Sequence, residues 1–350
     1  MNLDRKTQWF LIILVIGIGL RLVVTLTQAP LMNGTGKMNI DECAHWNYIM
    51  HIRSAHELPD FAWSSVDTGT LPPPYAGNMV DASGDTIKSK IYVPTYEYYQ
   101  FPGYHLLQAV VSGGSVITAR YVNVILFVIS IILIWLASQN LYAIGLLSLF
   151  PGPVEWLTYV SNDSGILLAS CVLAYALVKK QTWLYVIGIV LCSVMKMQGA
   201  MICGAMALWF AFKNRSYAAI ALGGVILSLA IFVNRYDLMK VNAMTIDQLY
   251  TPTYTLLRAA SGIVFTALLP HFANASVGAF PIMSAILVLS GWLVYQSIKA
   301  KPISEFTLAA SAVVVVFLVY IFTCPYFEGR LLFPAIPFLA SNYKVNALYA

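Results

Sequence analysis

The apolar run WFLIILVIGIGL, residues 9–20, is long enough to form most of a membrane-spanning helix. It follows Arg5 and Lys6, and it continues beyond Arg21 through residues 22–24. Because no A-x-A cleavage site follows, the run is predicted to be an uncleaved first membrane helix rather than a signal peptide. Because Arg21 interrupts the run, we expect its side chain to snorkel toward the interface or to pair with an acidic loop residue.

The composition of the chain points to the same class of protein. Of its 350 residues, 59% are hydrophobic and only 10% are charged, whereas a soluble domain carries about 25% charged residues. The net charge of +5 is modest and reflects basic loops, which argues against a nucleic-acid partner. We therefore expect an all-α polytopic membrane protein with a single transmembrane domain over residues 1–350 and no separate soluble domain.

Apolar runs recur along the chain and predict about ten transmembrane helices. They lie near residues 9–27, 119–138, 141–157, 164–179, 182–197, 199–212, 216–233, 277–298, 305–323 and 330–345. Cytoplasmic loops carry an excess of Lys and Arg, and here such residues mark four positions, namely 5–6, 179–180, 213–215 and 299–301. Ten crossings place all four positions and both termini in the cytoplasm.

The same topology makes residues 28–118 a long external loop. Within it, residues 41–57 predict a short amphipathic helix lying along the membrane interface, and residues 103–118 predict a half-buried helix. Residues 252–272 predict another external helix. The same topology places all the candidate site residues at the outer face: Asp41, Glu42, His45, Asp163, Lys196, Arg258, Glu328 and Arg330.

The external loop contains the stretch Ile40-Asp41-Glu42-Cys43-Ala44-His45 near its start. Ionisable groups near a bilayer are costly, and they usually line a cavity or do chemistry. Asp41 and His45 are four residues apart and share a helix face, so we interpret His45 as a hydrogen-bonding partner of the acidic pair. Two other interpretations remain open. An acidic residue can cap the start of the helix, or the two carboxylates and the histidine can bind a metal.

Five short motifs follow one another along the chain. They are Asp41-Glu42-Cys43-Ala44-His45, QFPGYHLL at residues 100–107, ARYVN at 119–123, Ser161-Asn162-Asp163, and EGRLLFP at 328–334. Together they resemble motifs of the GT-C superfamily of integral membrane glycosyltransferases. The resemblance is to bacterial members with an early D-E-x-x-H and a late Q-G-R-Y-x-x-P. The chain lacks the D-x-D associated with metal use in one branch of that superfamily, so no metal or other cofactor is indicated.

The resemblance implies a reaction and a location. It implies an inverting glycosyltransferase of the bacterial inner membrane that takes part in glycan biosynthesis of the cell envelope. Such an enzyme moves a hexose or pentose from a polyprenyl-phosphate donor to a glycan, lipid or protein acceptor. The transfer would take place at the outer face of the membrane.

The resemblance also implies roles for individual residues. A carboxylate of the acidic pair would take the acceptor proton, and Asp41 is favoured over Glu42. A guanidinium pairs well with a phosphate, so Arg330 would bind the donor phosphate and Glu328 would orient it. Three residues would assist or support these groups: Lys196 and Arg258 at the phosphate, and Asp163 beside them.

Each role has a simpler structural alternative. Arg330 can snorkel at a helix end, Lys196 can be an ordinary loop lysine, and Asp163 can cap a helix. The function has alternatives as well. A transporter or flippase for a lipid-linked saccharide would also use outer-face cations and an apolar groove, and a non-catalytic subunit of a glycan-assembly complex would not need the acidic pair.

Overall fold

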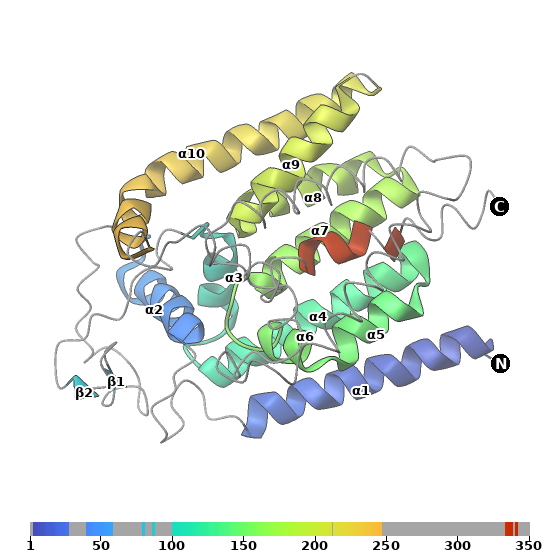
Figure 1. Ribbon diagram of the computed structural model, residues 1–350, viewed down its shortest axis with the longest axis horizontal. Coiled ribbons are helices and arrows are strands. Elements are labelled where there is room, and N and C mark those ends of the chain that lie inside the picture. Colours follow the sequence, from blue (N-terminus) through green and yellow to red (C-terminus); the bar gives the residue numbers. More distant parts are fainter. Residues whose placement is uncertain are drawn as a thin grey trace, which may run out of the picture.

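A computed structural model of the chain describes residues 3–27, 40–58, 79–80, 86–87, 100–211, 213–246, 333–338 and 340–341. This part of the chain is helical apart from one small hairpin (Figure 1). The helices are α1 (Arg5–Thr27), α2 (Ile40–Ala55), α3 (Gly103–Val111), α4 (Val116–Ser138), α5 (Leu141–Leu149), α6 (Pro151–Trp156), α7 (Asp163–Lys179), α8 (Thr182–Met195), α9 (Met197–Phe210) and α10 (Arg215–Ile246). In the hairpin, β1 (Met79–Val80) and β2 (Thr86–Ile87) pair antiparallel, with Met79 opposite Ile87.

The fold is that of a membrane protein. Three stretches are long and apolar enough to cross a bilayer by length and composition: α1, α4 and residues 215–235 of α10. Two shorter apolar helices, α8 and α9, lie between α7 and α10. The expected crossings near residues 277–298 and 305–323 lie outside the described residues, as does most of the one near 330–345.

The apolar run at residues 141–157 does not form the single helix expected from the sequence. It forms α5 and α6, which are separated at Phe150, where the backbone is extended (φ −77°, ψ 138°). Pro151 explains the break, because a proline disfavours the helical conformation of the residue before it and lacks an N–H of its own. The same proline suits the first position of α6, where no N–H is needed.

Arg21 of α1 binds backbone carbonyls on both sides of this break. Its buried guanidinium lies 3.3 Å from the centre of the Phe127 ring. Nη2 donates to the carbonyls of Leu147 and Pro153, at 2.7 and 3.2 Å. Nη1 donates to those of Gly17 and Ser148, at 3.1 and 3.2 Å. The side chain therefore neither snorkels nor pairs with a carboxylate. It satisfies carbonyls at the end of α5 that have no helical partner and no water within a membrane.

The contacts fix how the helices run relative to one another. Phe10, early in α1, stacks on Trp135, late in α4, with ring centres 4.4 Å apart. Arg21, late in α1, lies on Phe127 in the middle of α4, so these two helices are antiparallel. Asn123, early in α4, contacts the turn before α7, so α4 and α7 start at the same end.

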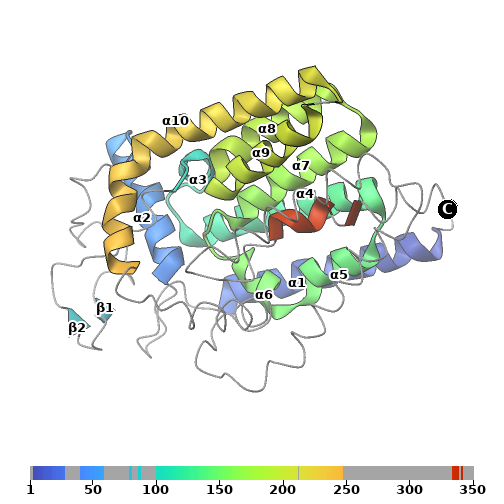
Figure 2. The same cartoon turned by 45° about the horizontal axis from the view of Figure 1, so that its top comes forward.

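Helices α7 to α10 then run up and down through short connections. As a result, Arg5, Lys179–Lys180 and Lys213–Arg215 all lie at one end of the bundle, here named the basic end (Figure 1). Helices α2 and α3 and the starts of α4 and α7 lie at the opposite end, here named the polar end (Figure 2). Residues 333–338 and 340–341 pack along the bundle through Phe333 and Ala340, in one apolar cluster with Phe10 of α1.

Candidate functional site

Helix α2 carries Glu42 into the protein interior. It spans Ile40–Ala55, close to the expected range of 41–57. Glu42 and His45 are buried as completely as the apolar residues Trp46 and Ile49. Burial of the described side chains therefore extends beyond the expected apolar stripe.

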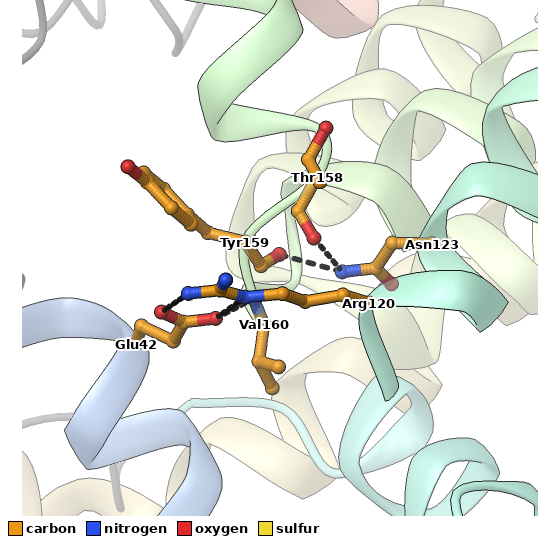
Figure 3. Close-up of polar contacts among 6 residues, drawn as sticks. All are labelled: Glu42, Arg120, Asn123, Thr158, Tyr159 and Val160. Atoms are coloured by element: carbon orange, nitrogen blue, oxygen red, sulfur yellow. Dashed lines mark hydrogen bonds and ion pairs between the residues drawn. The ribbon is translucent and has the colours of Figure 1, made fainter. Parts of the chain in front are cut away.

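Glu42 forms a closed ion pair with Arg120 of α4 (Figure 3). Arg120 Nε donates to Oε1 at 2.7 Å and Nη2 donates to Oε2 at 2.6 Å, which is bidentate geometry. The backbone N–H of Val160 donates to the same Oε1 at 3.0 Å. Both side chains are fully buried, so each charge depends on the other for its stability. This ion pair fixes α2 against α4.

Asn123 lies one turn after Arg120 and joins three elements. Its Nδ2 donates to the carbonyls of Thr158 and Tyr159, at 3.3 and 2.5 Å, in the turn between α6 and α7 (Figure 3). Its Oδ1 accepts from Tyr104 Oη at 3.0 Å and from Gln108 Nε2 at 2.9 Å, both of α3. One amide side chain thus sets the positions of α3, α4 and the turn that carries Val160.

A second buried ion pair lies at the start of α7. Lys196 Nζ donates to Asp163 Oδ1, and both side chains are nearly inaccessible. Lys196 is the single extended residue between α8 and α9, so the pair ties that connection to α7. Beside it, Asn162 Nδ2 donates to Gln100 Oε1 at 3.0 Å. The ammonium of Lys196 is therefore already matched by a carboxylate.

Two histidines form a third buried contact. His45 Nδ1 and His105 Nε2 are 2.9 Å apart, and His105 Nδ1 is 3.2 Å from the carbonyl oxygen of Phe101. The ring of Tyr48 stacks on His105 with centres 4.0 Å apart. Burial of the ring, together with the positive charge of Arg235 in α10, lowers the pKa of His105 to about 3.

The structure brings together four of the eight site residues expected from the sequence. Glu42, His45, Asp163 and Lys196 all lie in this polar cluster, which we define as these four with Gln100, Tyr104, His105, Gln108, Arg120, Asn123 and Asn162. The backbone of Asp41 belongs to α2, but its side chain is outside the described part, and so are Arg258, Glu328 and Arg330.

Sequence reasoning missed part of the cluster. The sequence predicts no individual role for Arg120, Asn123, Gln108 or His105. The signal was present, because Arg120 and Asn123 both belong to the ARYVN motif and His105 belongs to QFPGYHLL. What the sequence did not show is which motif contacts which.

The metal interpretation requires Asp41, whose side chain is outside the described part of the chain. Within the described residues, no group of three His, Cys, Asp or Glu side chains is placed to bind a metal ion. Glu42, one of the two carboxylates that interpretation required, is committed to Arg120.

No family model, curated protein or solved structure matches this chain significantly. A function must therefore be inferred from the motif residues and from how the fold arranges them.

Proposed function

We propose that this protein is a GT-C-type glycosyltransferase of the bacterial inner membrane. It would cross the membrane about ten times, with both termini in the cytoplasm and the polar end facing outward. It would move a hexose or pentose from a polyprenyl phosphate to an acceptor hydroxyl. This assignment extends the resemblance of the five motifs to the whole molecule.

The observation that supports the proposal most directly is the convergence of four motifs. Residues of the D-E-x-x-H, QFPGYHLL, ARYVN and Ser-Asn-Asp segments contact one another at the polar end. Glu42 pairs with Arg120, Tyr104 binds Asn123, and Gln100 binds Asn162. The four motifs are defined by sequence alone and span residues 41–163. Their contact in the folded protein is therefore an independent observation. Separate motifs that meet in this way are typical of a catalytic site.

In this proposal the two neighbouring carboxylates have different roles. Glu42 orients α2 through Arg120, because its oxygens already accept three hydrogen bonds. Asp41 is the general base. It takes the proton of the acceptor hydroxyl while the hydroxyl oxygen attacks the anomeric carbon and inverts it. The bond from that carbon to the phosphate oxygen breaks, and polyprenyl phosphate leaves as an anion.

The leaving phosphate requires cations more than it requires an acid. Stabilisation of developing charge is commonly the largest contribution to such a reaction. Arg330 and Arg258 would bind the phosphate in this proposal, with Lys196 assisting. Because Lys196 is paired with Asp163, its contribution would be shared with that carboxylate, and Arg330 carries the larger part of the role.

The test is the transfer of radiolabelled sugar from polyprenyl phosphates bearing a hexose or a pentose, in detergent at equal protein. General-base contributions are about 10²–10⁴-fold, so Asp41→Asn should lose that much turnover while it still binds the donor. Asp4→Asn is the matched control, because Asp4 is an exposed carboxylate at the basic end. It should transfer normally. An Asp41→Asn variant with wild-type turnover would remove the base from the proposal.

A further inference from the structure

Three exposed cations lie together at the basic end, where α7 ends and where α8 and α10 begin. Lys179 and Lys180 end α7, and α8 follows almost directly. The side-chain hydroxyls of Thr182 in α8 and Tyr217 in α10 are 3.0 Å apart. Lys180 and Arg215 each lie two residues before one of these hydroxyls. The fold thus brings cations from two separate segments to one place.

The packing of α8 against α10 holds these cations in position. The ring of Tyr185 stacks on that of Tyr217 with centres 4.4 Å apart, and Tyr185 Oη donates to the carbonyl of Tyr217 at 3.1 Å. Two turns further along α10, a Cβ on Gly224 would lie 2.6 Å from Ile189 Cγ2 of α8. Because the two helices are in close contact over this length, Arg215 is held beside the start of α8.

The positive charge of this surface has no counterpart in the surrounding sequence. Residues 164–236 contain no Asp or Glu, although they include all three cations. The side chains of Lys179, Lys180 and Arg215 are exposed. A cationic surface of this kind attracts an anionic partner.

An apolar stripe runs along α8 away from the cations. Four exposed side chains follow one another at the i, i+3, i+4 and i+7 positions of one helix face: Trp183, Val186, Ile187 and Val190. Between the first and the last of them the helix rises about 10 Å, which is most of the roughly 15 Å depth of one hydrocarbon leaflet. Trp183, 63% exposed, lies nearest the cations, and tryptophan favours the level of the membrane interface. The order of cations, aromatic ring and apolar face matches the order of phosphate, interface and acyl chain in a phospholipid.

We propose that these three cations and the exposed stripe of α8 form a binding surface for an anionic phospholipid. The cations bind its phosphate, and an acyl chain lies along the stripe. The surface is at the opposite end of the bundle from the polar cluster, so this lipid is distinct from the proposed sugar donor and the inference does not depend on the proposed reaction. A general attraction of basic residues to one membrane face would involve Arg5 and Lys6 equally. The proposed surface involves α7, α8 and α10 alone.

The test compares two pairs of cations at the same end of the bundle. Native mass spectrometry measures binding of dioleoylphosphatidylglycerol to the full chain in detergent, with dioleoylphosphatidylcholine as the zwitterionic probe of equal chain length. A cation near an anionic lipid contributes about fivefold in affinity, so Lys180→Gln with Arg215→Gln should weaken binding of phosphatidylglycerol about 25-fold. Arg5→Gln with Lys6→Gln removes the same charge from exposed positions of α1, and binding should change less than about twofold.

A second comparison tests the apolar part of the surface. Trp183→Ala should weaken binding of phosphatidylglycerol, whereas Trp9→Ala should not, although Trp9 of α1 is also exposed near the basic end. Glycerol phosphate has the phosphate without the acyl chains, so it should not displace the lipid at equal concentration. Displacement by it would show an anion site that is not specific for lipid, and would overturn the proposal.

The remaining outcomes are equally decisive. Equal losses in the two double variants would reduce the effect to general charge and refute a defined surface. Equal affinity of the wild type for the two phospholipids would refute the anionic partner. If the first double variant does not fold, Lys180→Gln alone decides. Phosphatidylglycerol should raise the Tm of the wild type, and this rise should be smaller in Lys180→Gln but not in Lys6→Gln. The same rise in both single variants would oppose the proposal.

Discussion

At the scale of single residues, the clearest constraint is that a buried charge needs a partner. Glu42 and Arg120 are separated by 78 positions in the chain and are both fully buried. Neither would be stable alone, because removing one member of a buried pair leaves an uncompensated charge. The pair therefore holds α2 in a unique position, and with it the neighbouring Asp41.

A double-mutant cycle tests this ion pair. We expect Glu42→Leu and Arg120→Met each to lower the free energy of unfolding by about 3–5 kcal/mol. The double variant should cost much less than the sum of the two, because two apolar side chains replace two charges. The measurement is reversible unfolding in mixed micelles. Glu57→Leu and Arg215→Met provide the control cycle, because both residues are exposed and lie on different parts of the chain, so their effects should be small and additive. Single costs below about 1 kcal/mol at Glu42 and Arg120 would contradict the buried pair.

The residue types of the site could be predicted from the sequence, but not their partners. The spacing of Asp41 and His45 predicted a helix with both on one face, and α2 spans them. The pairing of Glu42 with Arg120 could not be predicted, because it depends on how α2 docks onto α4. The same holds for His105, since a lone histidine in an aromatic segment gives no indication of a second histidine 60 positions away.

At the scale of elements, apolar runs predicted the positions of several described helices closely. The expected helices near 119–138 and 164–179 are α4 and α7. The division of 141–157 at Pro151 could have been read from the sequence, because the effect of proline on the preceding residue is local. The burial of Arg21 could not, because its acceptors belong to α5 and α6 and depend on tertiary packing.

Two glycines of α9 give a matched test of helix packing. A Cβ on Gly199 would lie 1.7 Å from the carbonyl oxygen of Cys192 in α8, whereas a Cβ on Gly204 would meet nothing within 4 Å. A backbone carbonyl cannot rotate away, so Gly199→Ala must displace α9 from α8. We expect a loss of at least about 1–3 kcal/mol. Gly204→Ala should be neutral or stabilising by up to about 1 kcal/mol. The measurement is the Tm of each variant in detergent.

The result would also bear on the site, because Lys196 forms the connection between α8 and α9. Displacement of α9 should weaken the contact between Lys196 and Asp163. Equal Tm values for the two glycine variants would show that α8 and α9 are not packed this closely.

At the scale of the whole molecule, the fold separates two kinds of charge. Among the described residues, exposed Lys and Arg side chains lie at the basic end, and the buried ion pairs lie at the polar end. The basic loops predict the orientation of the chain, and the motifs predict the candidate site independently of those loops. Their placement at opposite ends of the bundle agrees with the expected topology, in which the basic end is cytoplasmic.

Cysteine labelling with a membrane-impermeant reagent tests this orientation in intact cells. In a variant without its five native cysteines, single cysteines are placed at exposed positions. Ala55, the last residue of α2, represents the polar end. Lys180 and Gln139, in the turns after α7 and α4, represent the basic end. We expect labelling at 55 from outside, and labelling at 139 and 180 only after permeabilisation.

Gln139 is the informative control, because its turn carries no basic residue and its side follows from the order of the crossings and from the packing of α1 against α4. Labelling of 139 together with 55 would contradict the antiparallel arrangement of the helices themselves. Labelling of 139 and 180 but not 55 would preserve the fold and reverse its orientation. The polar cluster would then face the cytoplasm, where a donor presented at the outer face could not reach Asp41. A protein with that orientation could not carry out the proposed reaction.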